Sequence, residues 1–276
     1  MKTVRIISKD SGLGNQIQLI PIIQKLKEYY KVISDSDVYR EMGVDISQYG
    51  DANYNFVCFG YDWKKFFKAR LKYNGTFYGF KYRIKGKHIG IGYKRSLRFY
   101  ENKGEILNNI DLLKMCFGLD ASPNFEIQER KPEKNKIVFG ISNKLGKSLS
   151  EHKWRELYKN LKSRGYNPLS VDHKIEGIPY KNTPTLRDLR NELKRAEKFI
   201  GTDSGVMHVA DAIGVPMVVM FGATSAEKNK PLGRSEILKS NLPCSPCFNW
   251  GRIKCDIGYK CMDFEVNDII KAFDKL

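Results

Sequence analysis

The sequence predicts an α/β protein built from two doubly wound domains, and three observations lead to this prediction. A strand–helix–strand alternation begins at residues 4–7. A second alternation runs from residue 136 to residue 222. Between them lies a polar stretch with two prolines, residues 121–135. Because repeated βαβ units build parallel sheets with helices on both faces, we expect domains at 1–125 and 126–276 that face each other across a cleft.

The N-terminal domain is expected to begin with a strand, a glycine loop and a helix. Val4–Ile7 is apolar, residues 9–14 form the loop, and apolar side chains at helical spacing continue to Tyr30. Pro21 should kink this helix unless it falls in the first turn, where proline is tolerated. The later expected elements are strands at 32–33 and 54–59 and an amphipathic helix at 105–117 that Gly118 ends.

The C-terminal domain repeats the alternation. Strands are expected at 136–141, 168–171, 198–201 and 216–222, and helices at 151–164, 187–196 and 204–213. The last strand is almost continuously apolar, which is typical of a parallel strand buried on both faces.

Composition excludes several classes of protein. Hydrophobic residues make up 41% and charged residues 29% of the 276 positions, so the chain is neither disordered nor collagen-like. The longest uncharged stretch, residues 212–226, is shorter than the ~20 apolar residues that a bilayer span requires. The first ten residues lack the apolar core of a signal sequence. We therefore expect a cytoplasmic protein whose contact with the inner membrane, if it has one, is peripheral.

A net charge of +17 predicts an anionic partner. Residues 63–100 contain 12 Lys or Arg, 11 aromatic residues and no acid. Charge runs are usually solvated faces, but the complete absence of acids favours a binding face. The residues expected to contact an anionic acceptor are Lys64, Lys65, Lys68, Arg70, Arg83, Arg95 and Arg98.

The clearest chemical signal lies between the last two predicted strands. Thr202, Asp203 and Ser204 stand where a strand ends and a helix begins. One of them should cap the helix. The first amides of the helix can then donate hydrogen bonds to an anion such as a diphosphate. Gly205 permits close approach of a ligand, and His208, one turn further on, can donate to a phosphate.

The loop after the last strand should lie on the same edge of the sheet, because ligands of open α/β sheets bind at the carboxyl ends of the strands. It contributes the hydroxyl group of Thr224. The alternative interpretation of both loops is an ordinary capped helix with a half-buried histidine.

Residues 202–224, TDSGVMHVADAIGVPMVVMFGAT, resemble the donor-site motif of the ADP-heptose:lipopolysaccharide heptosyltransferases, glycosyltransferase family 9. Residues 12–15, GLGN, followed by Pro21, are similar to the first glycine loop of that family. Lys147, seven residues before Trp154, falls where the family places a cationic lysine. The resemblance implies a GT-B fold of two Rossmann-like domains, with the acceptor in the first, the nucleotide sugar in the second, and no metal needed for catalysis.

The resemblance also implies roles for individual residues. Lys147 would stabilise the charge that grows on the departing nucleotide diphosphate. The residues expected to bind the donor are Gly12, Gly14, Ser142, Asn143, Thr202, Asp203, Ser204, Gly205, His208 and Thr224.

The general base departs from the family pattern. Family members carry an aspartate after the second glycine of the first loop, whereas this chain has Asn15, which cannot accept a proton at neutral pH. Asp10, on the same loop, is the expected base, and the alternative is that Asp10 only caps the loop. The residues expected to take part in catalysis are Asp10, Asn15 and Lys147.

Four of the six cysteines are crowded near the end of the chain, which suggests a structural zinc site in a cytosolic protein. Their spacing is not that of a standard zinc ribbon, so paired or free thiols are the alternative. The expected ligands are Cys244, Cys247, Cys255 and Cys261, while Cys58 and Cys116 should be small buried hydrophobic residues.

Residues and resemblance together predict an inverting, metal-independent glycosyltransferase. It would transfer a sugar from a nucleotide-diphosphate sugar to a hydroxyl group of a large anionic acceptor. A phosphorylated glycolipid such as lipopolysaccharide is favoured, and a hydroxylated base of phage DNA is the alternative. A non-catalytic nucleotide-sugar-binding module is a third interpretation, for which Asn15 is the argument.

Overall fold

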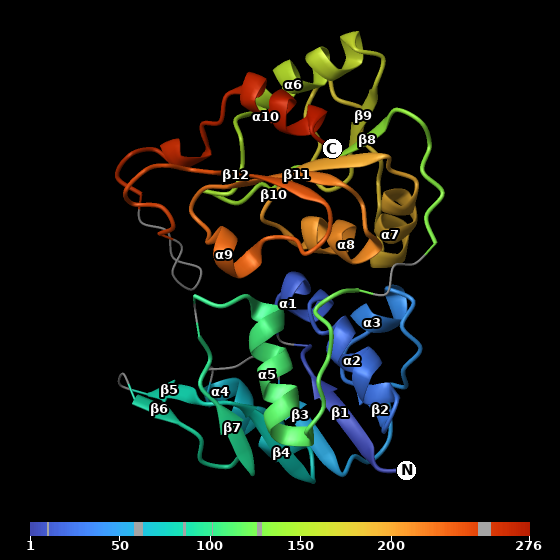
Figure 1. The fold of residues 1–276 in the computed structure, drawn as a ribbon, viewed down its shortest axis with the longest axis vertical. Helices are drawn as coiled ribbons and strands as arrows, with labels where there is room; N and C mark the ends of the chain where they lie inside the picture. The colour runs from blue at the N-terminus through green and yellow to red at the C-terminus, as the bar shows by residue number, and fades with distance from the viewer. Residues whose placement is uncertain (10, 58–62, 85–86, 101, 126–128, 248–254) are drawn as a thin grey trace. The chain divides into compact units, whose positions relative to one another are not determined.

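The computed structural model describes residues 1–9, 11–57, 63–84, 87–100, 102–125, 129–247 and 255–276. The chain divides into two compact units, Met1–Phe125 and Glu126–Leu276, both drawn in Figure 1. Each unit contains a five-stranded sheet whose strand pairs are all parallel. The predicted α/β class with two Rossmann-like units is therefore confirmed.

The sheet of the first unit has the strand order β2-β1-β3-β4-β7. The order reverses at β1, and right-handed crossovers then place the following helices on opposite faces of the sheet. The strands are β1 Thr3–Ile7, β2 Lys31–Ser34, β3 Tyr54–Val57, β4 Thr76–Phe80 and β7 Arg95–Leu97. A two-stranded antiparallel hairpin, β5 Tyr82–Ile84 and β6 Lys87–Ile89, is inserted before β7.

Pro21 decides how the first crossover is built. The sequence predicted one helix from Ile17 to about Tyr30, but the structure has two, α1 Leu13–Ile17 and α2 Ile20–Lys27. Pro21 lies in the first turn of α2. Because proline has no N–H to continue a helix but fits a first turn, α1 ends and a new helix begins there.

The remaining helices of the first unit are α3 Val38–Glu41, α4 Trp63–Lys72 and α5 Glu105–Phe117. Gly118 ends α5 in the left-handed conformation, with φ 71°, as the sequence predicted. In Figure 1, α2 and α5 lie side by side. Helix α4 packs against the sheet through Phe66, which belongs to one core cluster with Ile7, Val57 and Phe77.

The sheet of the second unit has the strand order β12-β11-β10-β8-β9. The central strand β10 pairs with both β8 and β11, and all five residues of β11 are buried, as its apolar sequence predicted. The strands are β8 Lys136–Gly140, β9 Asn167–Ser170, β10 Lys198–Thr202, β11 Met217–Phe221 and β12 Ser235–Lys239.

The helices of the second unit begin at caps that can be read from the sequence. Ser150 accepts the N–H of Lys153 at the start of α6, and Thr185 forms a capping box with Asp188 in α7. Figure 1 shows α6 and α10 on one face of the sheet and α7 and α8 on the other. The helices are α6 Glu151–Ser163, α7 Leu186–Lys194, α8 Gly205–Ile213, α9 Ala226–Asn229 and α10 Val266–Asp274, with a short 3₁₀ turn at Lys260–Met262.

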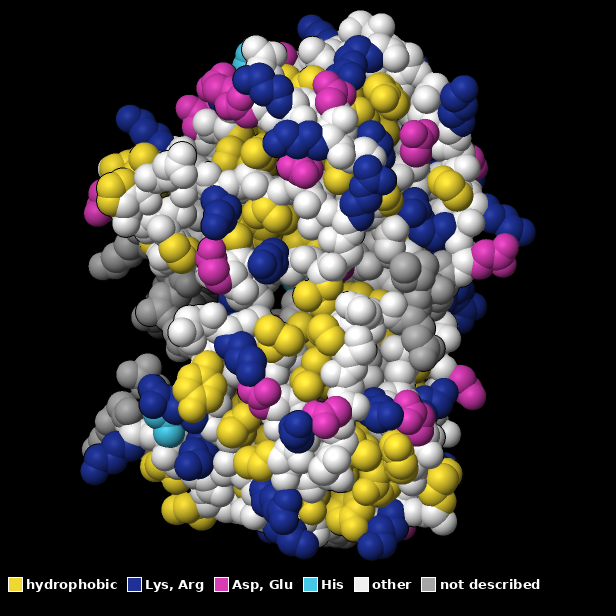
Figure 2. Space-filling model, in the orientation of Figure 1, with side chains coloured by type: hydrophobic (Ala, Val, Ile, Leu, Met, Phe, Trp, Pro, Cys, Tyr) yellow, Lys and Arg dark blue, Asp and Glu magenta, His cyan; other side chains and the backbone are white. Residues whose placement is uncertain are grey.

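Charge is spread over the surface. Figure 2 shows Lys and Arg side chains scattered over the visible face of each unit, with fewer acids among them. None of the helices in the described part of the chain has the length and apolar character needed to cross a membrane.

Candidate functional site

The start of α8 is built as the sequence predicted, with Ser204 as the cap. Ser204 has an extended backbone, and its Oγ accepts the N–H of Met207 at 3.3 Å. The helix therefore begins where β10 ends, at the carboxyl edge of the sheet. Because the first amides of a helix have no acceptor within the helix, those of Gly205 and Val206 suit an anion.

Asp203 is the centre of a buried polar cluster. Its side chain is 5% exposed, and its Oδ2 accepts the Nζ of Lys147 at 3.2 Å and the Nδ2 of Asn229 at 3.0 Å. The Nε2 of His208 lies 3.8 Å from Oδ1, and Thr224 adds a hydrogen bond. Burial opposes ionisation, but the charge of Lys147 and these other partners outweigh it and lower the pKa of Asp203. Asp203 is thus a buried carboxylate.

Lys147 comes to this cluster from the loop that follows β8. Its Nζ also contacts the backbone oxygen of Asp203 at 3.4 Å, and its side chain is 15% exposed. The loop is fixed by a backbone hydrogen bond from Ala223 to Gly146 at 3.2 Å. The ammonium group of Lys147 therefore lies at the N-terminal end of α8, where the helix dipole also favours a bound anion.

His208 is buried in the first turns of α8, with its side chain 8% exposed. Burial lowers its pKa, although the carboxylate of Asp203 opposes the shift. A pKa below the ordinary value leaves the imidazole neutral at neutral pH. His208 can then serve as a hydrogen-bond donor rather than as a cation.

Asn229 is the member of the cluster that the sequence did not reveal. It ends the short helix α9, which Ser225 caps by accepting the N–H of Lys228 at 3.3 Å. Nothing in the sequence shows that this helix turns its last residue toward Asp203. The one available signal was that Asn229 is a polar residue shortly after the predicted loop at Thr224, on the sheet edge where ligands bind.

The other donor-binding predictions in this unit have different surroundings. The side chain of Thr202 is fully buried, and within the described residues its Oγ1 has no hydrogen-bond partner. Ser142 is buried and accepts the N–H of Lys144 at 3.2 Å, whereas Asn143 is exposed. The structure therefore brings together Lys147, Asp203, His208 and Thr224 and leaves Thr202 beneath the surface.

The residues predicted from the first glycine loop belong to the first unit. Gly12 precedes α1 and is exposed, Gly14 lies within α1, and Asn15 is an exposed residue of α1. Asp10, the expected general base, lies outside the described residues. These four predictions stay predictions.

Six of the seven predicted anion-binding residues lie on three elements of the first unit, and Arg98 directly follows one of them, β7. Lys64, Lys65, Lys68 and Arg70 lie on α4, although the guanidinium group of Arg70 stacks on the ring of Phe77 at 4.7 Å. On β7, Arg95 donates to the backbone oxygen of Met115 at 2.6 Å. Arg98 is exposed and lies 5.8 Å from the ring of Tyr100. Of Arg83, on β5, only the backbone is described.

The cysteines are not joined to one another in the part of the chain that the structure describes. Cys116, Cys244, Cys247, Cys255 and Cys261 are free thiols there. Over the same residues, no group of three or more His, Cys, Asp or Glu side chains is placed to hold a metal ion. The four clustered cysteines as placed do not fit a metal, and the structural zinc stays a prediction for metal analysis of the purified protein.

The two cysteines expected to be buried have different outcomes. Cys116 is buried, which raises the pKa of its thiol to about 12. This agrees with its predicted role as a small hydrophobic residue. Cys58 lies outside the described residues.

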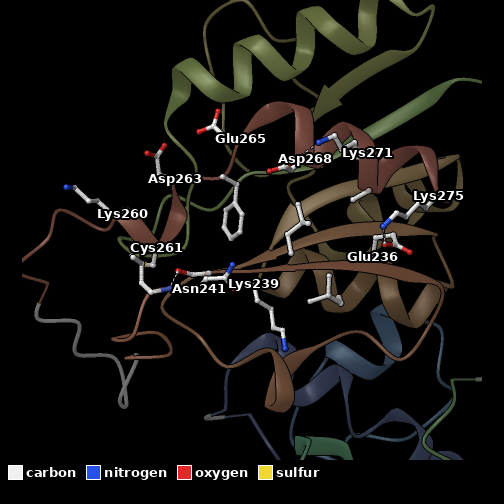
Figure 3. A pocket seen from close by; sticks show the side chains of 16 residues that line it. Glu236, Lys239, Asn241, Lys260, Cys261, Asp263, Glu265, Asp268, Lys271 and Lys275 are labelled. Atoms are coloured by element: carbon white, nitrogen blue, oxygen red, sulfur yellow. Dashed lines mark hydrogen bonds and ion pairs between the residues drawn. The ribbon is translucent and has the colours of Figure 1, made fainter.

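A cavity of about 640 Å³ lies at another place in the second unit, along the edge strand β12. Figure 3 shows charged side chains around it from β12, the 3₁₀ turn and α10. Several are already paired, including Lys271 with Asp268 at 3.1 Å and Lys275 with Glu236 at 3.6 Å. Of the lining residues only Cys261 was singled out by its sequence.

The two units, each built on a parallel five-stranded sheet, have the architecture of the GT-B fold. The family model "Glycosyltransferase family 9 (heptosyltransferase)" matches residues 184–255, which include α8 and the loop after β11. The resemblance seen in the sequence is therefore confirmed for this segment.

Individual proteins that resemble the chain agree with this family. Lipopolysaccharide heptosyltransferase 1 of Pseudomonas aeruginosa is 34% identical over 64 residues, which are 23% of this chain and 18% of that protein.

Two solved structures share the fold. A family 9 glycosyl transferase from Veillonella parvula matches with a TM-score of 0.74 and 14% identity, over 99% of this chain and 96% of that one. The heptosyltransferase WaaC of E. coli with ADP has the same TM-score, 12% identity, and coverage of 99% of both chains.

Proposed function

We propose that the protein is an inverting, metal-independent glycosyltransferase that uses a nucleotide-diphosphate sugar. The observation that carries this proposal is the ammonium group of Lys147 held against the buried carboxylate of Asp203 at the start of α8. A fixed cation beside helix amides suits a diphosphate. The match to the family 9 model over residues 184–255, which include Asp203 and α8 but not Lys147, supports it.

In the proposed reaction an acceptor oxygen forms a bond to the anomeric carbon of the sugar. The bond from that carbon to the diphosphate oxygen breaks, and the nucleoside diphosphate leaves with the electron pair. Lys147 and the amides of Gly205 and Val206 stabilise the charge that grows on the leaving group, more in the transition state than in the bound donor. Asp203 acts as a positioning residue that holds Lys147 in place.

The proton of the acceptor hydroxyl group must go to a base, and we assign that role to Asp10. Asn15 cannot take it, because an amide is not a base at neutral pH. If Asp10 is the base, Asp10→Asn abolishes transfer while donor binding is kept. If Asp10 only caps its loop, Asp10→Asn lowers the free energy of unfolding, but the protein that remains folded keeps its transfer activity.

For the acceptor we propose a phosphorylated glycolipid at the cytoplasmic side of a membrane. The support is that the curated relative is named a lipopolysaccharide heptosyltransferase and that residues 63–100 are basic without any acid. A hydroxylated DNA base is the second candidate, favoured by the aromatic residues within the same segment. Retention on duplex DNA that falls steeply with salt would favour DNA.

Calorimetric titration with a panel of nucleotide sugars tests the donor site. Wild-type protein should bind one of them, and Asp203→Asn should bind it much more weakly. Glu227→Gln, at an exposed carboxylate paired with Lys239, is the matched control and should bind normally. Unchanged binding by Asp203→Asn would refute the assignment. Binding without either transfer or hydrolysis would favour a non-catalytic module.

A further inference from the structure

Helix α4 carries a second apolar stripe that is largely exposed, although the ring of Phe67 also contacts the rings of Phe66 and Tyr82. Trp63, Phe67 and Leu71 are 41%, 45% and 91% exposed. Their spacing of four residues places them on one side of the helix. The rings of Trp63 and Phe67 are in contact, with 6.2 Å between their centroids.

The helix is held in the unit by a different side. Phe66 and Ala69 are buried, and the ring of Phe66 lies 4.2 Å from that of Tyr93 and 5.6 Å from that of Tyr82. At 3.6 residues per turn, the exposed stripe is turned roughly 130° from this buried side. Packing within the unit therefore explains why Phe66 and Ala69 are apolar. It does not explain why the exposed side chains of the stripe are apolar.

The charges beside the stripe select the kind of partner. Lys64, Lys68 and Lys72 of α4 are exposed, and the segment 63–100 contains no Asp or Glu. A basic helix with aromatic and aliphatic side chains along one side is typical of helices that lie in the surface of an anionic bilayer. Duplex DNA would satisfy the lysines but leaves Leu71 without an apolar contact.

We propose that α4 docks the first unit onto an anionic lipid bilayer. Trp63, Phe67 and Leu71 enter the boundary between headgroups and acyl chains, and the lysines contact lipid phosphates. This contact is with the surface only, since the helix has 10 residues and a span needs about 20. The proposal goes beyond the transfer reaction and does not depend on the identity of the donor.

Vesicle flotation tests the proposal with the whole protein. Wild-type protein should float with vesicles of phosphatidylcholine and phosphatidylglycerol but not with vesicles of phosphatidylcholine alone. The affinity of Phe67→Ser/Leu71→Ser for the anionic vesicles should be at least about tenfold lower than that of wild type, because two apolar side chains no longer enter the lipid. Lys64→Gln/Lys68→Gln should weaken binding by a similar factor and reduce its dependence on salt. Tyr49→Ser, at an aromatic residue of the same unit that is 84% exposed, is the matched control and should bind as wild type does.

Trp63 provides a second readout. In a Trp250→Phe background, its emission should shift to shorter wavelength when anionic vesicles are added. The shift should be absent when Trp63→Phe is added, because the remaining Trp154 is already fully buried.

Two results would overturn the proposal. One is anionic vesicle binding that Phe67→Ser/Leu71→Ser leaves unchanged. The other is retention on duplex DNA, lost in Lys64→Gln/Lys68→Gln, without any vesicle binding. Donor binding is measured by calorimetry in every variant, so that a failure of the nucleotide-sugar site is seen separately from a failure of α4.

Discussion

Asp203 and Lys147 are 56 residues apart in the sequence and form an ion pair with 3.2 Å between Oδ2 and Nζ. Their side chains are 5% and 15% exposed. Removing one partner of a buried pair leaves the other charge uncompensated. Stability and donor binding must therefore be measured separately when either residue is changed.

Lys147→Met should lower kcat/KM for transfer on the order of 100-fold or more, because the charge of the leaving diphosphate loses its fixed cation. Steady-state kinetics with a saturating acceptor would measure this. Lys144→Met, at an exposed lysine of the same loop, is the control and should keep nearly full activity. Equal activity of the two variants would remove Lys147 from the mechanism.

Ser204→Asp separates capping from anion binding. Aspartate caps helices as well as serine does, so the free energy of unfolding should change by less than about 1 kcal/mol. Its carboxylate, however, stands where the diphosphate is proposed to bind, and donor affinity should fall by at least about tenfold through like-charge repulsion. Ser150→Asp makes the same change at the cap of α6 and should leave donor binding intact. Tight donor binding by Ser204→Asp would place the diphosphate elsewhere.

Asn229→Ala should cost about 1 kcal/mol of stability, because the carboxylate of Asp203 loses one hydrogen-bond donor. Donor affinity should fall by less than it does in Asp203→Asn, since Lys147 remains in place. Thermal unfolding and calorimetry measure the two effects. Asn191→Ala, at an exposed asparagine of α7, should show neither. A stability equal to wild type would mean that the contact contributes nothing.

Much of the fold could be predicted because local signals and packing agree. The apolar run of β11 is buried along its whole length, and Ser204 caps α8 where the strand pattern ends. Pro21 shows the limit of such signals. Its effect was expected, but whether it kinks one helix or begins a second depends on the turn at residues 18–19, which apolar spacing does not define.

The candidate site was predictable where its residues share one segment or, as with Thr224, follow a neighbouring strand to the same sheet edge. Asp203 and His208 lie on a single strand–loop–helix segment, so their proximity follows from helix geometry. Lys147 came from the resemblance, and Asn229 was missed. The contacts of both with Asp203 depend on how loops from β8 and β11 converge at the sheet edge, which residue spacing along the chain does not encode.

The neutral state of buried His208 predicts how stability depends on pH. Its pKa is lowered from 6.5 in the folded protein, so between the two pKa values the unfolded chain holds more protons and acidification favours unfolding. The lowered pKa of Asp203 acts in the same direction at lower pH, since its contribution is lost as pH falls below 3.8. Stability should therefore decline as pH falls from about 7.

In His208→Asn, the free energy of unfolding should fall less steeply below about pH 6.5 than in wild type. Each protein is compared with its own stability at pH 8. His152→Asn, at a histidine whose side chain is 82% exposed, should follow the wild-type curve. Denaturant unfolding at a series of pH values measures all three proteins. A His208→Asn curve parallel to wild type would show that His208 accepts a proton as readily in the folded protein as in the unfolded chain. In that case the imidazole would be available as a second cation beside Lys147, and its proposed role as a neutral hydrogen-bond donor would be wrong.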